Sequence, residues 1–269
     1  MSNLKPEVYT FNNNDGIKIF GKQGTRVTIP KSAISHINGD IKVSFQEFFK
    51  KSDLILNNIP TNSIGDSWLE TGGSFFLHIQ DSNGKTIVLD KNIMLEFPIN
   101  SNIADTSNMS VWRGDGEALY GNLRPFDIWR EIASQDSTAN VEINNESREY
   151  LMNTPTFNWI NCDYIFETTS DLTKVKVSVS NQEIDIKDIN TFIVLKNINS
   201  VLRLNQNEND FKSFPIPIGE EAFIVSLGIN NEIYFYIEQT TISRNQTLQI
   251  HLEQVNLNDL YERIKVVDN

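Results

Sequence analysis

The stretch from residue 24 to residue 98 opens with Gly24-Thr-Arg-Val-Thr-Ile-Pro-Lys-Ser-Ala-Ile34 and closes with Ile93-Met-Leu-Glu-Phe-Pro98. Residues 25–29 alternate between polar and apolar, which is the period of a half-buried strand. Pro30 has no amide hydrogen to give to a ladder and therefore ends the strand, while Gly24 supplies the turn before it. The stretch is thus predicted to consist of short strands joined at glycine and proline corners.

Runs of the same kind continue toward the C-terminus, for example Ala222-Phe-Ile-Val-Ser-Leu227. Short strands at such spacing are typical of antiparallel sandwiches. The fold class is therefore predicted to be all-β, with two antiparallel β-sandwich domains and a short C-terminal helix. The predicted organisation is an N-terminal tail (1–16), a first β-sandwich domain (17–119), an irregular connection (120–155) and a second β-sandwich domain with the helix (156–269).

The predicted helix begins after Asn256, a residue type that caps helices with its side chain. Leu257, Leu260, Tyr261 and Ile264 follow at i, i+3, i+4 and i+7. This spacing places four apolar side chains on one face of a helix. The helix is therefore predicted as the C-terminal element of the second domain.

The charge of the chain excludes some partners. The sequence has 269 residues and a formal net charge of −12 at pH 7. An acidic surface repels phosphate backbones and anionic lipid headgroups, so we predict no nucleic-acid partner and no peripheral membrane binding. A hydrophobic fraction of 39% argues against intrinsic disorder.

Cysteine content and terminal sequence say little about the compartment. Cys162 is the only cysteine, so no intrachain disulfide is expected, and its place in an aromatic strand predicts an inert buried thiol. No window of 18 apolar residues predicts a membrane-spanning helix. Because Met1-Ser-Asn-Leu-Lys-Pro6 has no apolar core, we expect either a cytoplasmic protein or one from which a leader was removed.

Residues of the types used in catalysis are present without a recognisable spacing. His36, His78 and His251 do not follow a metal-ligand pattern, and there is no Gly-x-Ser-x-Gly elbow. We therefore predict no metal, no cofactor and no catalytic residue, so the protein is not expected to be an enzyme. A hydrolase that assembles its site from scattered carboxylates is kept as a minor alternative.

The Gly-Gly pair in Leu69-Glu-Thr-Gly-Gly73 indicates a backbone conformation or a close contact that needs glycine. Gly72 and Gly73 precede an apolar run, so they are predicted to form a structural turn and to lie buried where a neighbouring chain approaches closely. Glu70 and Thr71 would bond the turn amides. A ligand-binding role for this turn is the alternative.

The chain contains the phrases Gly24-Thr-x-Val-Thr-Ile-Pro-x-x-Ala-Ile34, Gly39-x-Ile-x-Val-Ser-Phe-Gln-Glu47 and Leu69-Glu-Thr-Gly-Gly73. These phrases resemble a family of uncharacterised exported proteins and lipoproteins of Bacteroidota. Trp159-Ile-Asn-Cys-Asp163 and Phe214-Pro-Ile-Pro-Ile-Gly219 are similar to the second half of that family. The resemblance covers roughly residues 15–265 and implies an exported β-protein that acts through its surfaces.

The phrase from Gly24 to Ile34, Gly-x-x-Val-x-Ile-Pro-x-x-Ala-Ile, opens a strand and a turn. Through this phrase the first module is also similar to the β-sandwich domain shared by ankyrins, netrin receptors and zonula occludens scaffolds. Some members of that domain cleave themselves at a His-Phe-Ser tripeptide. Here the comparable strand reads Leu77-His78-Ile79-Gln80 and has no serine, so the resemblance does not imply self-cleavage.

Aromatic residues in the irregular middle of the chain suggest a ligand. Trp112, Tyr120 and Trp129 lie where loops are expected, and exposed aromatic rings stack on sugar rings. They are the predicted ligand-stacking residues of a carbohydrate-binding module. The alternative is that they fill the seam between the two domains.

Ser137 is a predicted O-glycosylation site. Envelope proteins of the bacteria that this chain resembles are modified at an Asp-Ser/Thr tripeptide, and Asp136-Ser137-Thr138 matches it. The surrounding polar segment has no apolar period and is expected to be an accessible loop. The alternative is a chance match in a linker rich in serine and threonine.

Together these features favour a non-enzymatic binding or scaffolding protein of the bacterial cell envelope, in the periplasm or on the outer-membrane surface. The expected partner is another envelope protein or a glycan, and membrane association is expected only through the lipid anchor of a removed leader. The alternative function is a carbohydrate-binding accessory module. If no leader existed, the protein would be cytoplasmic.

Overall fold

The computed structural model describes residues 5–12, 15–63, 67–100, 103, 106–114, 129–132, 138–155 and 158–269. Most of the described elements are strands, and nearly all of their pairings are antiparallel, as the predicted fold class requires. The chain forms two compact units. Unit 1 contains Met1–Phe49 and Thr71–Tyr164, and unit 2 contains Lys50–Glu70 and Ile165–Asn269.

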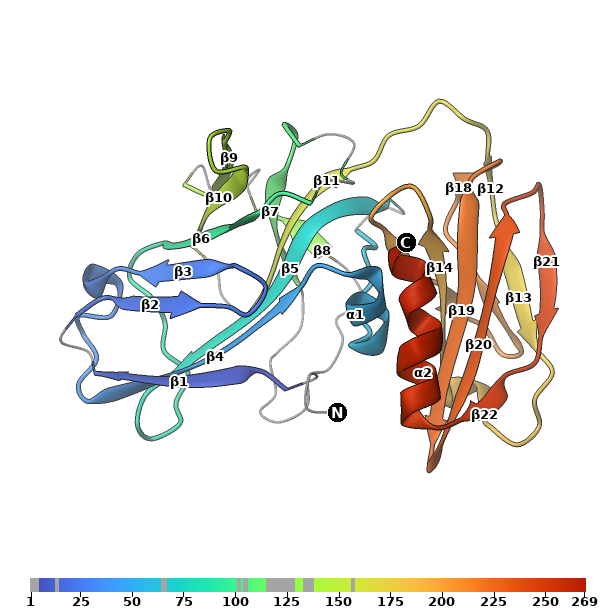
Figure 1. The fold of residues 1–269 in the computed structure, drawn as a ribbon, viewed down its shortest axis with the longest axis horizontal. Coiled ribbons are helices and arrows are strands. Elements are labelled where there is room, and N and C mark those ends of the chain that lie inside the picture. Colours follow the sequence, from blue (N-terminus) through green and yellow to red (C-terminus); the bar gives the residue numbers. More distant parts are fainter. Residues whose placement is uncertain are drawn as a thin grey trace. The chain divides into compact units, whose positions relative to one another are not determined.

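Unit 1 is a sandwich of two sheets (Figure 1). The six-stranded sheet has the order β1 (Glu7–Asn12), β4 (Asp40–Phe48), β5 (Leu69–Gln80), β11 (Asn158–Ile165), β7 (Ser110–Gly114) and β8 (Trp129–Glu131). The five-stranded sheet has the order β2 (Ile17–Phe20), β3 (Arg26–Ile29), β6 (Ile93–Pro98), β10 (Glu149–Thr154) and β9 (Asn140–Asn144).

The core of unit 1 follows from alternation along these strands. Ile17 and Ile19 of β2 are buried, while the residues between and after them are exposed. A group of aromatic rings fills the space between the two sheets. The ring centres of Phe75 and Phe97 are 4.7 Å apart, and those of Phe97 and Tyr150 are 5.4 Å apart. Burying each such side chain contributes about 1.5–3 kcal/mol, so this layer stabilises the sandwich together with the buried aliphatic residues around it.

The domain boundaries differ from the predicted ones. The residues predicted as an N-terminal tail include β1, which pairs with β4 from Glu7 to Asn12. The described part of the predicted irregular connection contains β8, β9 and β10, and β10 is a central strand of unit 1. Residues 50–70, expected in the first domain, belong to unit 2. In β10 the alternation is weak in the sequence because Leu151 lies on the less buried face and Thr154 lies on the buried face.

Gly24 and Pro30 have the predicted structural roles. Gly24 has a φ of +102° in the turn that joins β2 to β3, and the amide of Gly21 donates to the carbonyl of Thr25 at 2.8 Å. Pro30 follows the last residue of β3 and precedes a 3-10 turn, η2 (Lys31–Ala33). Gly24 thus lies in the turn before β3, and Pro30 marks the end of β3.

Gly72 and Gly73 are buried as predicted, but they do not form a turn. Both lie inside β5, whose residues are all buried. A Cβ on Gly72 would lie 3.1 Å from the carbonyl oxygen of Cys162, and one on Gly73 would lie 2.6 Å from the ring of Phe49. The predicted close approach is present, whereas the predicted turn is wrong because the strand continues through both glycines.

Unit 2 contains two larger sheets, a strand pair and two helices (Figure 1). The five-stranded sheet has the order β15 (Val201–Arg203), β14 (Ile189–Leu195), β19 (Glu221–Asn230), β20 (Glu232–Thr241) and β22 (Glu253–Val255). The four-stranded sheet has the order β16 (Asn205–Gln206), β17 (Asp210–Lys212), β13 (Lys176–Val179) and β21 (Thr247–Ile250), in which β13 and β21 are parallel. The remaining elements are β12 (Leu172–Thr173), β18 (Ile216–Pro217), α1 (Lys51–Leu56), η3 (Ile186–Asp188), α2 (Leu257–Ile264) and η4 (Lys265–Asp268).

The predicted C-terminal helix is α2. The side chain of Asn256 accepts a hydrogen bond from the amide of Asp259 at 3.0 Å, which is the predicted cap. Leu260 and Ile264 are buried, and the guanidinium of Arg263 lies 5.2 Å from the ring centre of Phe235 in β20. The helix thus covers the outer strands of the five-stranded sheet of unit 2.

Candidate functional site

The two described tryptophans of the predicted sugar-stacking set are buried. Trp112 is 4% exposed and Trp129 is 0% exposed. The indole Nε1 of Trp112 donates to the backbone oxygen of Asp163 at 2.9 Å, which fixes the ring. The prediction of exposed stacking platforms is therefore wrong for these residues, because neither presents a ring face to solvent. Tyr120 and the predicted glycosylation residue Ser137 lie outside the described residues.

The three histidines lie in separate surroundings. His78 in β5 contacts the hydroxyl of Thr86 at 3.0 Å, and burial lowers the pKa of its imidazole. His36 pairs with Asp90 at 2.7 Å. In the part of the chain that the structure describes, no three histidine, cysteine or carboxylate side chains are placed to hold a metal ion.

His251 lies near a serine and a glutamate, a combination that hydrolases use. Its Nδ1 is 3.4 Å from the hydroxyl of Ser180, and its Nε2 is 3.9 Å from a carboxylate oxygen of Glu183. The hydroxyl of Ser180, however, donates to the carbonyl of Ile250 at 3.0 Å. Because the serine proton is engaged with the backbone and both histidine distances are long, this group is not arranged for proton transfer.

A buried polar cluster in unit 1 brings hydroxyl, amide and carboxylate side chains into contact. We call Thr71, Ser74, Asn161 and Asp163 the Asn161 cluster. All four residues are 0% exposed. Thr71 and Ser74 belong to β5, and Asn161 and Asp163 belong to its neighbour β11. The cluster therefore joins two central strands of the six-stranded sheet.

Three donors converge on the side-chain oxygen of Asn161. The hydroxyls of Thr71 and Ser74 each donate to Oδ1 at 2.9 Å, and the amide of Cys162 donates to it at 3.1 Å. The side-chain nitrogen of Asn161 donates to Oδ2 of Asp163. The side-chain amide of Asn161 therefore has hydrogen-bond donors at its oxygen and a carboxylate acceptor at its nitrogen.

The glycines of β5 create the space for this arrangement. Residues three apart in a regular strand point to opposite faces, yet Thr71 and Ser74 reach the same oxygen. Gly73, with a φ of +156°, lies between them, and its amide donates to the hydroxyl oxygen of Thr71 at 3.1 Å. Cys162 lies next to the cluster, and burial together with Asp163 raises the pKa of its thiol, so it is not a reactive nucleophile.

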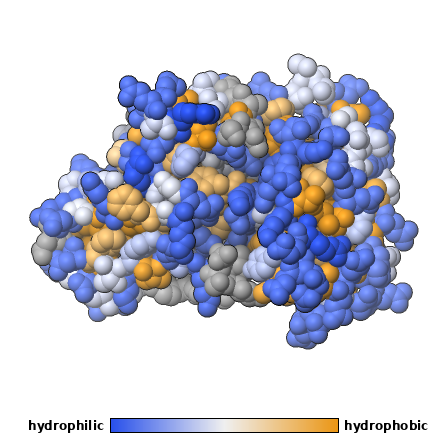
Figure 2. All heavy atoms as spheres, viewed as in Figure 1, coloured by the Kyte–Doolittle hydropathy of each residue, from blue (hydrophilic) through white to orange (hydrophobic). Residues whose placement is uncertain are grey.

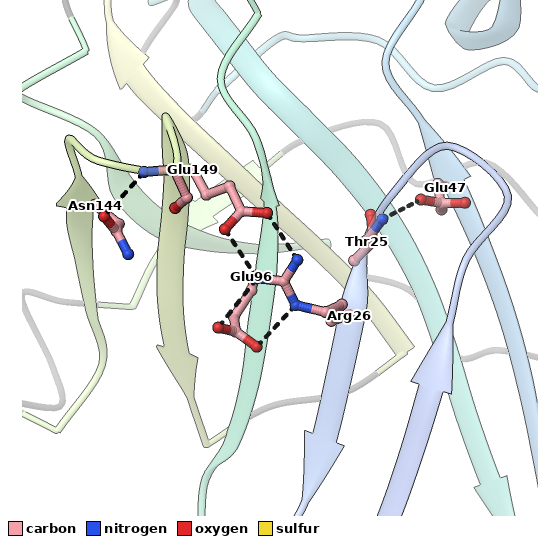
Figure 3. Close-up of polar contacts among 7 residues, drawn as sticks. Thr25, Arg26, Glu47, Glu96, Asn144 and Glu149 are labelled. Atoms are coloured by element: carbon pink, nitrogen blue, oxygen red, sulfur yellow. Dashed lines mark hydrogen bonds and ion pairs between the residues drawn. The ribbon is translucent and has the colours of Figure 1, made fainter.

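A glutamate holds the β2–β3 turn (Figure 3). Glu47 of β4 accepts from the amide of Gln23 at 2.8 Å and from the amide of Thr25 at 3.0 Å. A Cβ on Gly21 would lie 2.4 Å from this carboxylate, so a larger residue there would require the Glu47 side chain to move. The turn of one sheet is thus fastened to a strand of the other.

Arg26 of β3 joins three strands on the outer face of the five-stranded sheet (Figure 3). Its guanidinium donates to both oxygens of Glu149 at 2.8 Å and to both oxygens of Glu96 at 3.3 Å. The two carboxylates raise the pKa of Arg26, and Arg26 lowers the pKa of Glu149. Because the guanidinium is already engaged by two carboxylates, we interpret this group as a structural tie and not as an anion site.

Lys51 is a buried cation in unit 2. Its ammonium donates to the backbone oxygens of Leu195 at 2.6 Å and Lys196 at 2.8 Å. Burial lowers its pKa to about 8, against the opposing effect of Asp268 and Glu70. The next residue, Ser52, donates to the carboxylate of Asp268 from its amide at 2.9 Å and from its hydroxyl at 2.6 Å. The start of α1 is therefore fastened to the C-terminal end of the chain.

One edge of unit 1 carries exposed apolar side chains. β1 forms the edge of the six-stranded sheet and β2 forms an edge of the five-stranded sheet, in the part of the chain that the structure describes. Val8 of β1 is 65% exposed and Phe20 of β2 is 66% exposed. The hydroxyl of Tyr9 donates to the carbonyl of Phe20 at 3.3 Å, so the two edge strands are adjacent. On the face in view, Figure 2 shows hydrophobic residues reaching the surface among hydrophilic ones.

Asn161, Asp163 and Lys51 were not singled out from the sequence. The signal for the first two was present, because Trp159-Ile-Asn-Cys-Asp163 places two polar residues within an otherwise apolar strand. A buried polar group needs a partner, and such residues therefore indicate an internal network. Nothing in the sequence distinguishes Lys51 from its neighbour Lys50.

Comparison with protein-family models found no match, and comparison with curated proteins found none either. A solved structure that shares some likeness is described as the Bacillus anthracis TIE protein, with 8% sequence identity and a TM-score of 0.21. The likeness covers 93% of this chain and 41% of that chain, so this chain spans less than half of that structure. With so low a TM-score the likeness carries no argument about fold or function. None of the helices in the described ranges is long and apolar enough to cross a membrane.

Proposed function

We propose that the protein is a non-enzymatic binding or scaffolding protein of the bacterial cell envelope that acts through its sheet edges and loops. The observation that supports this proposal is the exposed edge at β1. A strand edge has backbone donors and acceptors that a further strand can pair with, and proteins recognise extended segments in this way. The proposed partner is a segment of another envelope protein that adds to this edge.

β1 lacks the features that normally block strand addition. Natural edge strands are protected by proline, by lysine or by very short length. β1 has six residues and contains neither proline nor lysine. Its one charged residue, Glu7, is paired with Lys22 at 2.6 Å, which reduces the charge it presents to an incoming strand. Val8 would then contribute an apolar contact on the same edge.

The proposed location in the cell envelope is based on the resemblance to exported Bacteroidota proteins. It does not depend on the exposed edge at β1. Fractionation of native cells tests it, since recovery with the envelope supports it and recovery with the cytosol contradicts it. The glycan-binding alternative is not favoured by any observation, because Trp112 and Trp129 are buried.

The edge is tested by placing a photo-crosslinking amino acid at Val8 in native cells. Val88 is the matched control, because it is an apolar residue of unit 1 that is 72% exposed and lies outside the strands. We expect a discrete protein adduct from position 8 and none from position 88. Equal labelling at both positions, or no adduct at position 8, would show that β1 does not receive a partner.

A further inference from the structure

We propose that the Asn161 cluster is the site of a self-formed ester cross-link between the side chains of Thr71 and Asn161. The hydroxyl oxygen of Thr71 would bond to the side-chain carbonyl carbon of Asn161 and displace the amide nitrogen as ammonia. The reaction occurs once in each molecule and modifies only the chain itself. It is therefore independent of the proposed binding function.

The nucleophile is held in place by the fold. Thr71 lies 2.9 Å from Oδ1 of Asn161, and its own oxygen accepts the amide hydrogen of Gly73 at 3.1 Å. Two groups held at contact distance react with effective molarities of up to about 10⁵–10⁸ M, which makes a reaction that is negligible between free side chains feasible here. The glycines of β5 permit this approach, because a Cβ at Gly72 would press on the backbone oxygen of Cys162 at 3.1 Å.

The remaining donors on Asn161 Oδ1 have the geometry of an oxyanion hole. When Thr71 attacks, the hydroxyl of Ser74 at 2.9 Å and the amide of Cys162 at 3.1 Å stay on the oxygen where negative charge develops. Preorganised donors at such distances stabilise a tetrahedral intermediate. This role distinguishes Ser74 from Thr71, although both hydroxyls contact the same oxygen.

Protons and bonds balance without any other reactant. The new C–O bond forms first and leaves the negative charge on Asn161 Oδ1, and the hydroxyl proton of Thr71 then passes to this oxygen, to which it is already hydrogen-bonded. On collapse of the intermediate the C–N bond breaks, and this proton is transferred to the departing nitrogen. The carboxylate of Asp163, which accepts a hydrogen bond from that nitrogen, positions it and relays the proton. The products are one ester and one ammonia.

The surroundings protect the product. An ester on the surface would hydrolyse, but all members of the cluster are 0% exposed. The cross-link would join residues 90 positions apart in the sequence, on neighbouring central strands. It would thus close a long loop of unit 1 covalently where no disulfide can form, because the chain has one cysteine.

The test is the intact mass of the purified full chain, followed by tryptic mapping. We expect a mass lower than that of the sequence by one ammonia. Trypsin should yield one species in which residues 52–85, which contain Thr71, are joined to residues 149–174, which contain Asn161. Hydroxylamine, which cleaves esters, should separate the two peptides.

Two results would overturn the proposal. One is a full intact mass with both peptides recovered separately. The other is an ammonia deficit confined to residues 149–174, because cyclisation of Asn161 onto its own backbone loses the same mass without joining two peptides. Since these measurements use the unaltered chain, a variant that fails to fold does not leave the proposal undecided.

Variants separate the assigned roles. Thr71→Val should restore the full mass, whereas Ser74→Ala should retain the nucleophile and slow the appearance of the deficit in freshly made protein. Thr61→Val is the matched control, since Thr61 in unit 2 is also 0% exposed and bonds a hydroxyl, that of Ser200, at 2.8 Å. The control should keep the deficit of the unaltered chain. Cross-linked peptide from Thr71→Val would show that Thr71 is not the nucleophile.

Discussion

Lys51 shows how one residue links the stability of unit 2 to pH. An ammonium group prefers water, and here it is held by two backbone carbonyls in a buried position. Burial is the largest influence on its pKa, which falls from 10.5 to about 8, while the attraction of Asp268 and Glu70 only partly offsets it. The folded state therefore releases the Lys51 proton at a lower pH than the unfolded state does.

The free energy of unfolding of unit 2 is expected to rise as the pH increases from about 8 to about 10.5. In that range the unfolded chain still binds a proton that the folded chain has released, so stability increases with pH. The gain from Lys51 is on the order of 3 kcal/mol at most. Urea unfolding across this range measures it.

Lys51→Met should remove this contribution to the pH dependence, and Lys174→Met, at an exposed position of the same unit, should not. A pH dependence that is identical in the unaltered chain and in Lys51→Met would show that the ammonium of Lys51 is not desolvated in the folded state.

At the scale of elements, the β2–β3 turn depends on a side chain from the opposite sheet. Glu47 is 8% exposed, and its carboxylate accepts hydrogen bonds from the amides of Gln23 and Thr25. A turn whose amides are satisfied by its own backbone would not need such a partner. The turn and β4 are consequently expected to lose order together.

Glu47→Gln is expected to destabilise unit 1 by about 1–3 kcal/mol, because one of the two acceptors is replaced by a donor facing a buried amide. Hydrogen exchange at the amides of Gln23 and Thr25 should accelerate more than exchange in the core strands. Glu146→Gln, at an exposed position of the same unit, is the control and should leave both exchange rates and stability unchanged. Unchanged exchange at the two amides in Glu47→Gln would contradict the role assigned to this carboxylate.

The sequence was informative for elements whose apolar residues alternate or recur. The alternation of residues 25–29 identified β3, and the spacing of Leu260 and Ile264 identified α2. Both patterns arise because one side of each element is buried and the other is not. β5 is buried on both faces, so its glycines could not be placed inside a strand from alternation. The Asn161 cluster could not be assembled either, since Thr71 and Asn161 meet only through the pairing of distant strands.

At the scale of the whole molecule, unit 2 is built from two separate pieces of the sequence. Residues 50–70 supply α1, and the amide of Thr61 donates to the carbonyl of Val201 at 2.7 Å. Trp68 stacks on Phe166 with ring centres 4.8 Å apart. These contacts are integral to the core of unit 2, which residues 165–269 cannot complete alone.

A fragment of residues 165–269 is expected to lack the cooperative thermal unfolding that unit 2 shows in the full chain, because it loses the buried residues contributed by 50–70. A synthetic peptide of residues 50–70 added in excess should restore part of that transition. Circular dichroism during heating measures both effects. A fragment that melts as cooperatively without the peptide as with it would show that the segment is dispensable.

The attachment of Ser52 to Asp268 also sets an order of events during translation. The ribosome completes unit 1 at residue 164, yet the partners of α1 at Leu195 and Asp268 have not been made by then. At about 5–20 residues per second, the nascent chain waits on the order of 5–20 s for them. During that interval Leu54, Ile55 and Ile59, which are buried in the finished molecule, have no core to enter. Unit 2 can therefore close only after Asp268 has been made, and a chain that stops before this residue would leave a chaperone-dependent segment far upstream of the missing part.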